Sequence, residues 1–164
     1  MATTKNEATK DTAGVIAPPP LLYLGALIVG AGLERLWPLS APGDVWTGWP
    51  VRALGGLLVL AGAALGFAAR RRFKAAATPV EPWKPTTALV TSGPYARTRN
   101  PLYLTLTLVY LGLGLLFATP WILLLVPPLL LVVQEGVIKR EERYLEARFG
   151  EDYRRYKAQV RRWL

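Results

Sequence analysis

The chain has 164 residues, and 52% of them are hydrophobic, a fraction that favours a membrane protein over a soluble domain of this length. It contains neither Cys nor His, which excludes disulfides, thiolate chemistry and the usual zinc, haem and imidazole sites, so no metal site is expected. The formal net charge is +9. Because the basic residues flank apolar runs, we expect them to mark a membrane face rather than a nucleic-acid site.

Residues 1–17 are small, polar and of mixed charge, and they predict a disordered tail. Residues 21–39 then form an apolar run that is long enough for a bilayer core of roughly 30 Å. A secretory signal is the alternative for this run, but its apolar part is too long and the tail before it is not clearly basic. We therefore expect the first transmembrane helix here.

A second apolar run covers residues 51–69 and contains several Gly and Ala residues, which allow close helix packing in lipid. The loop before it, 40–50, is rich in turn residues. Trp46 and Trp49 in this loop are typical of a membrane interface. Together the first two runs predict an N-terminal pair of transmembrane helices within residues 18–78.

The second half of the chain begins with a long, proline-rich connection, 75–100, and long ordered connections are often functional. It leads into two further apolar runs, 102–118 and 121–138, which are joined by a turn of two residues. So short a turn keeps the two helices antiparallel and adjacent. Pro127-Pro128 lies inside the fourth run and should kink it.

Residues 139–164 are charged, and their apolar and aromatic residues recur at helical spacing, which predicts an amphipathic helix. Gly150 should break this helix or change its direction. Lys and Arg on its opposite face are typical of a helix lying on anionic lipid. By the positive-inside rule, this tail and the basic segment 70–100 face the cytoplasm, whereas the loop 40–50 carries no Lys or Arg.

These elements indicate an all-α fold class: a polytopic membrane protein with about four transmembrane helices and an amphipathic cytoplasmic C-terminal helix. We expect a single membrane domain over residues 18–164, in which residues 79–164 contribute a functional loop, a transmembrane hairpin and the C-terminal helix. Four spans place both termini in the cytoplasm, and the expected location is the cytoplasmic (inner) membrane.

Two polar clusters flank the expected hairpin and share its cytoplasmic end, one at residues 92–103 and the other at residues 139–144. The side chains that we expect to meet there are Arg99, Asn100, Glu141 and Glu142. Carboxylates accept hydrogen bonds from hydroxyl or ammonium groups, and Arg binds a carboxylate in a forked geometry. The pattern favours a polar pocket against an apolar wall, with structural ion pairing as an equal alternative.

Several motifs of the second half have a characteristic order and separation. They are Gly93-Pro94-Tyr95, Arg99-Asn100-Pro101-Leu102-Tyr103, a glycine-bearing apolar hairpin, Arg140-Glu141-Glu142-Arg143-Tyr144-Leu145, Phe149-Gly150 and Tyr153. In these motifs the chain resembles the isoprenylcysteine carboxyl methyltransferase family and the related phospholipid methyltransferases. The resemblance covers residues 79–164 and implies an integral membrane enzyme that binds S-adenosylmethionine at the cytoplasmic face.

The resemblance also implies which residues form the site. The cofactor-binding candidates are Arg99, Asn100, Pro101, Tyr103, Glu141 and Glu142, with Tyr95, Tyr144 and Tyr153 as further candidates. Arg99 is the candidate catalytic residue because it can orient a carboxylate nucleophile. Family members commonly have His where this chain has Asn100, which can hydrogen-bond but cannot titrate. This departure argues against histidine-based proton transfer and puts the closest match to the prenylcysteine enzymes in doubt.

The implied activity is transfer of a methyl group to a lipophilic acceptor: a prenylcysteine-type carboxylate, a thiol or a lipid amine that reaches the site laterally from the bilayer. A sulfonium methyl is already activated, so such an enzyme must mainly align the reactants in a dry pocket. Two alternatives stay open. One is an NADPH-dependent membrane reductase of the sterol type, and the other is a membrane scaffold or transporter subunit without chemistry of its own.

Overall fold

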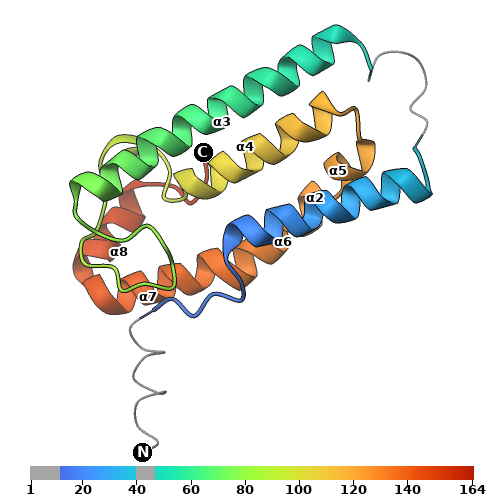
Figure 1. Cartoon of the computed structure of the whole chain (residues 1–164). Helices are drawn as coiled ribbons and strands as arrows, with labels where there is room; N and C mark the ends of the chain where they lie inside the picture. The colour runs from blue at the N-terminus through green and yellow to red at the C-terminus, as the bar shows by residue number, and fades with distance from the viewer. Residues whose placement is uncertain (1–11, 40–46) are drawn as a thin grey trace, which may run out of the picture.

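The computed structural model describes residues 12–39 and 47–164, and these residues form helices and connecting loops without a strand (Figure 1). Most of the expected disordered tail, and Trp46, lie outside the described residues. The helices are α2 (Pro19–Leu36), α3 (Trp49–Ala75), α4 (Pro101–Leu116), α5 (Pro120–Leu124), α6 (Val126–Val133), α7 (Lys139–Phe149) and α8 (Glu151–Gln159). A short 3₁₀-helix, η1 (Gly93–Ala96), and a π-helical turn, η2 (Gln134–Ile138), complete them. The all-α class is therefore confirmed.

Helix α4 lies between α3 and α2, and it packs most extensively on α3 (Figure 1). Small residues make this contact possible. A Cβ atom on Gly112 would lie 2.6 Å from the carbonyl oxygen of Gly55, and one on Gly62 would lie 3.0 Å from Val109. The glycines of the second apolar run therefore act as predicted, since they allow the two backbones to approach closely, and Gly112 of the third run contributes in the same way.

The main apolar cluster joins α4 to α2, α5, α6 and η2. Tyr23 of α2 reaches across to α4, where its hydroxyl lies 2.8 Å from Oγ1 of Thr107. Its ring packs edge-on against that of Tyr110, with 6.0 Å between the ring centroids. Satisfying a buried hydroxyl within an apolar cluster in this way fixes the position of α2 along α4.

The fourth apolar run is broken where its prolines predict. Helix α5 ends at Leu124 and α6 begins at Val126, because Pro127 and Pro128 cannot donate the backbone hydrogen bonds that would continue α5. After the break, α6 continues through η2 into α7 without a loop. The expected break at Gly150 is also confirmed, since this residue has φ 52° and separates α7 from α8.

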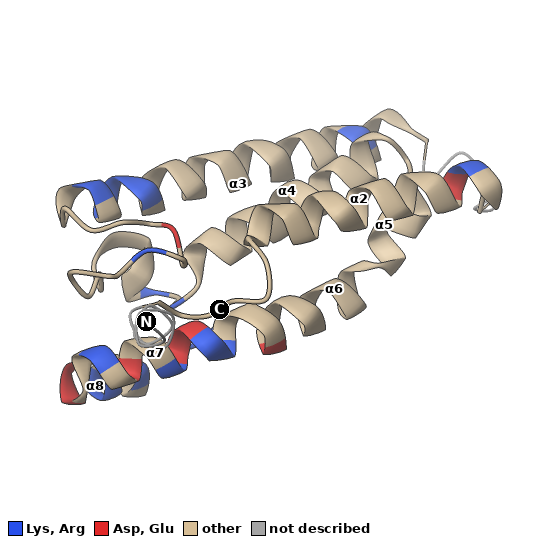
Figure 2. Cartoon of the chain, turned by 60° about the horizontal axis from the view of Figure 1, so that its bottom comes forward, with Lys and Arg blue, Asp and Glu red and all other residues tan. Residues whose placement is uncertain are grey.

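By length and composition, α3 is the one described helix that is long and apolar enough to cross a membrane, and α4 is apolar but shorter. The expected count of four spans therefore remains a prediction. Several large apolar side chains of α3 are exposed, including Leu57, Leu60 and Phe67. Charged side chains gather at the end of the molecule where α3 ends and α7 and α8 lie, while the opposite end carries few (Figure 2). This asymmetry agrees with one polar membrane face.

Candidate functional site

The loop before α4 is shaped by turn residues and presents two polar side chains at the start of that helix. Gly93 has φ 66° and packs against the Arg72 side chain, so a larger residue would be strained there. Gly93 is also the first residue of the 3₁₀-helix η1, and Pro101 occupies the first turn of α4, where a missing N–H costs little. Arg99 and Asn100 therefore stand next to the N-terminus of α4.

A cavity of about 450 Å³ opens at this point, between the end of α3, the loop, α4 and α7–α8. Its volume lies within the range of roughly 300–1,000 Å³ that is usual for small-molecule sites. Every site residue expected from the sequence lies on its wall: Tyr95, Arg99, Asn100, Pro101, Tyr103, Glu141, Glu142, Tyr144 and Tyr153. The two polar clusters thus meet, as the short turn between the third and fourth runs predicts.

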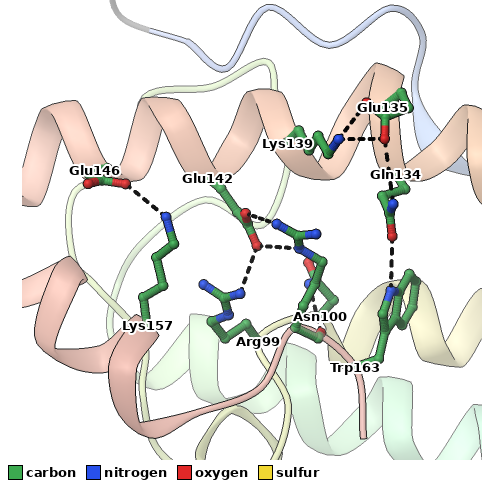
Figure 3. Close-up of polar contacts among 10 residues, drawn as sticks. Arg99, Asn100, Gln134, Glu135, Lys139, Glu142, Glu146, Lys157 and Trp163 are labelled. Carbon is green, nitrogen blue, oxygen red and sulfur yellow. Dashed lines mark hydrogen bonds and ion pairs between the residues drawn. The ribbon is translucent and has the colours of Figure 1, made fainter.

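Glu142 is held by two arginines. Arg99 Nη2 lies 3.2 Å from its Oε1, and Arg162 binds both oxygens, with Nε 2.9 Å from Oε1 and Nη2 2.7 Å from Oε2 (Figure 3). Burial acts to raise the pKa of Glu142, but the bonds from Arg162 and the charge of Arg99 outweigh it and hold that pKa below its usual range. The carboxylate is ionised at neutral pH, and most of its acceptor positions are used.

Arg99 itself is only partly satisfied. Its side chain is 9% exposed, and Nε and Nη1 are buried without a hydrogen-bond partner among the described residues. Unpaired donors of a buried guanidinium are costly, so an acceptor, either a bound group or an ordered water, is expected beside them. Since Arg99 lines the cavity, a carboxylate bound there would supply that acceptor in the forked geometry that Arg prefers.

Glu141 has a different environment, although it is the next residue. The hydroxyl of Tyr103 donates to its Oε1 at 2.6 Å, and its Oε2 has no partner within the described part of the chain. Burial raises the pKa of Glu141 to about 7, the Tyr103 bond opposes that rise, and the charge of Glu142 adds to it. Glu141 therefore offers the cavity an oxygen that is free to accept.

The aromatic residues of the site close its sides. Tyr156, which was not expected from the sequence, donates from its hydroxyl to the Tyr95 carbonyl at 2.7 Å and ties α8 to the loop. Tyr144 accepts the backbone N–H of Thr86 at 3.0 Å and so holds the 79–90 segment over the cavity. Burial raises the pKa of Tyr153 to about 12, although the nearby Arg99 acts in the opposite direction. These tyrosines are residues of the cavity wall.

The C-terminal residues were missing from the expected site. Asn100 Nδ2 donates to the Arg162 carbonyl at 2.9 Å, so its amide is partly used by the chain itself. The hydroxyl of Thr98 donates to the same carbonyl at 3.1 Å. The sequence pattern places Arg161-Arg162 among the basic residues of a helix that lies on lipid. The one indication in the sequence that this segment packs back on the protein is the apolar Trp163, which follows the basic pair.

Over its described residues the chain is all-helical, with one apolar helix of membrane-spanning length and a cavity at the charged end that carries Arg99 and both acids. These are features of a membrane-associated enzyme. The family model for phospholipid methyltransferases matches residues 51–152, more than half of the chain, so the chain belongs to that family. An uncharacterized protein from Haemophilus influenzae is 46% identical over 63 residues, which cover 38% of this chain and 100% of the relative. No solved structure matches the chain.

The family match confirms the resemblance seen in the motifs. It implies that the protein is a membrane methyltransferase. The match runs from α3 to the start of α8 and therefore includes the loop, α4 and the acidic pair of α7. A methyltransferase family favours neither a reductase nor a scaffold without chemistry. The N-terminal α2 and the residues after 152 lie outside the matched part.

Proposed function

We propose that the protein transfers a methyl group from S-adenosylmethionine to a lipophilic acceptor at the cytoplasmic face of the membrane. The observation that carries this proposal is the pairing, in one cavity, of a buried guanidinium with two unused N–H groups and a carboxylate with an unused oxygen. A ligand that carries both a carboxylate and hydroxyl or ammonium donors would satisfy both. S-adenosylmethionine has all of these groups.

The residues present fit this cofactor. Arg99 would hold a carboxylate through Nε and Nη1, and Glu141 would accept from a hydroxyl or an ammonium group through Oε2. Tyr95, Tyr103 and Tyr153 would form the sides of the site, as members of the cavity wall. When bound, the cofactor supplies an activated methyl group on a sulfonium, and the protein has to orient the acceptor and exclude water.

The acceptor would reach the site from the lipid. Much of the cavity wall that α3 and α4 provide is apolar, with Ala63, Gly66, Phe67, Leu102 and Leu106, although Arg70 and Thr105 line it as well. An acceptor carboxylate would be ionised at neutral pH and would need no base. With Arg99 holding the cofactor carboxylate, the role of orienting the acceptor that the sequence suggested for Arg99 is not part of this proposal, and Asn100, which does not titrate, is not required to remove a proton. A thiol or amine acceptor would have to arrive deprotonated or lose its proton to Glu141.

Isothermal calorimetry with the purified full chain in detergent tests the proposal. We expect S-adenosylmethionine to bind the wild-type protein, and Arg99→Ala to weaken binding by about a hundredfold or more, which corresponds to losing a charged bidentate contact. Arg97→Ala is the matched control, because Arg97 is exposed and does not line the cavity. Wild-type protein that binds no S-adenosylmethionine, or binding unchanged by Arg99→Ala, would contradict the proposal.

A reporter fused to either end tests the membrane orientation. The basic segment 70–100 and the tail lie at the same charged end of the molecule, which supports both termini facing the cytoplasm (Figure 2). A reporter that is active only in the cytoplasm should therefore work at the C-terminus. Activity restricted to the far side of the membrane would reject this orientation, and with it the cytoplasmic site.

A further inference from the structure

The last residues of the chain return to the site after α8 ends at Gln159. The backbone carbonyl of Arg161 accepts the N–H of Arg99 at 2.9 Å, and the carbonyl of Arg162 accepts from both Thr98 and Asn100. Trp163 Nε1 lies 3.5 Å from Oε1 of Gln134, the first residue of η2 (Figure 3). These bonds fasten the C-terminal segment, residues 160–164, across the start of α4 and against the helix that becomes α7.

Arg162 is the residue of this segment that reaches an acid of the site. Its guanidinium takes both oxygens of Glu142, whereas Arg99 makes one contact at 3.2 Å with the same carboxylate. The side chain of Arg162 is 31% exposed and that of Glu142 is 10% exposed, so the pair is largely removed from solvent. Arg162 does not belong to the cavity wall as the described residues define it.

This geometry leaves two N–H groups of Arg99, which is a residue of the cavity wall, without a partner among the described residues. A carboxylate and a guanidinium that meet without a competitor form two parallel bonds, because the fork of one matches the fork of the other. Glu142 cannot form this pair of bonds with Arg99, because both of its oxygens are already bound by Arg162. Arg99 Nε and Nη1 remain unpaired as a result.

We infer that Arg162 is a positioning residue for the cofactor site, which holds Glu142 in a forked ion pair and so keeps the guanidinium of Arg99 available to a bound carboxylate. This inference rests on the proposed function, because it assigns Arg162 a role toward the same ligand. Arg162 lies beyond residue 152, where the family match ends. It acts through Glu142 and Arg99 and does not touch the ligand.

Binding measurements on a set of variants test the inference. In Arg162→Gln the freed Glu142 turns to Arg99, so we expect the Kd for S-adenosylmethionine to rise by about tenfold or more. Arg162→Lys keeps the charge but not the fork, and it should recover part of the affinity. Arg161→Gln is the matched control, since its side chain is exposed and only its backbone contacts Arg99, and it should bind like wild type.

A double variant separates positioning from a merely structural role. Once Glu142→Gln has removed the carboxylate, nothing is left for Arg162 to restrain. Glu142→Gln combined with Arg162→Gln should therefore bind no more weakly than Glu142→Gln alone. If the two losses instead add, or if Arg162→Gln alone binds like wild type, the inference is wrong.

The proposed function and the inference can fail separately. Absence of binding to wild-type protein contradicts the function, whereas normal wild-type binding with an unchanged Arg162→Gln contradicts only the inference. Should Arg162→Gln not fold, as judged by its melting temperature and gel filtration, Arg162→Lys decides the matter. Partial loss in Arg162→Lys with wild-type stability supports the inference, and full wild-type affinity overturns it.

Discussion

Glu141 and Glu142 are consecutive residues of α7, and both line the same cavity, yet their surroundings differ in kind. Glu142 faces two guanidinium groups, which lower its pKa although the side chain is buried. Glu141 has a tyrosine hydroxyl and no cation among its described contacts, and burial raises its pKa to about 7. Burial acts to raise the pKa of both acids, and the partners decide whether that rise prevails: two guanidinium groups outweigh it at Glu142, whereas one tyrosine hydroxyl does not at Glu141.

The difference separates two tasks that the sequence presents as one acidic pair. Glu142 is committed to fastening α7 to the loop and to the C-terminal segment, so its loss should damage the fold. Glu141 is less committed, and the proposed function assigns its second oxygen to the ligand, so its loss should damage binding more than stability. Substitutions at either acid, or at a partner of one of them, should therefore have different effects.

The largest effect is expected for Glu142→Gln. Removing the carboxylate leaves the buried Arg99 and the half-buried Arg162 without an anion, and breaking such a pair from one side costs about 3–5 kcal/mol. The melting temperature in detergent should fall by roughly 6–20 °C, and the C-terminal segment should become more accessible to protease. Wild-type stability in Glu142→Gln would show that the two arginines do not depend on this acid.

Glu141→Gln should change how stability depends on pH. The ordinary pKa of this acid is 4.5 and its folded value is about 7, so between these values the folded state binds more protons than the unfolded state. Wild-type stability should therefore fall as pH rises through this window and stay level above it, by at most about 3 kcal/mol from this group. Melting curves of Glu141→Gln between pH 5 and 8 should lack that component. An identical pH profile in both proteins would place the titration elsewhere.

Tyr103→Phe should have a smaller effect and should shift the same titration upward. The Tyr103 hydroxyl lowers the pKa of Glu141 by donating to its ionised form, so removing the hydroxyl raises that pKa further above its usual range. Losing one hydrogen bond to a charged group costs about 1.5–3 kcal/mol when the group is ionised. The loss should accordingly be seen at pH 8 and largely vanish at pH 5. Equal destabilisation at both pH values would argue for a packing effect of the ring.

The smallest effect is expected for Glu135→Gln, which serves as the matched control for both acids. Glu135 pairs with Lys139 at 2.6 Å one turn along the same helical run, but both side chains are exposed (Figure 3). Exposed pairs of this spacing contribute little to stability, because water and salt screen them. Its melting temperature should therefore stay within a degree or so of wild type. A large loss would show that the helix from α6 to α7 is more sensitive to charge than this account allows.

The sequence predicts the meeting of the two polar clusters well, because the turn around Thr119-Pro120 is too short to let the third and fourth runs separate. The interruptions follow from single residues: Pro127 and Pro128 cannot donate, and Gly150 adopts a positive φ. Local chemistry of this kind is visible in the chain itself. The helix boundaries at these points accordingly agree with the expectation.

The roles of the two acids and of Arg162 could not be predicted. Adjacent glutamates in a charged helix look alike until the fold decides which one faces a cation. Arg162 sits at the end of a basic, amphipathic stretch, and its spacing favours a place on lipid rather than a return to α4. The return depends on backbone contacts of Arg161 and Arg162 with the loop before α4, and side-chain patterns do not report such contacts.

The pH dependence of S-adenosylmethionine binding tests most directly the claim that Glu141 is the acid that receives the ligand. The ratio of the Kd of Glu141→Gln to that of wild type should be measured by calorimetry from pH 6 to pH 8, which cancels any titration of the ligand itself. With a pKa of about 7 for Glu141, the ratio should grow by up to about tenfold over this range and level off. A ratio near one at every pH would contradict the account.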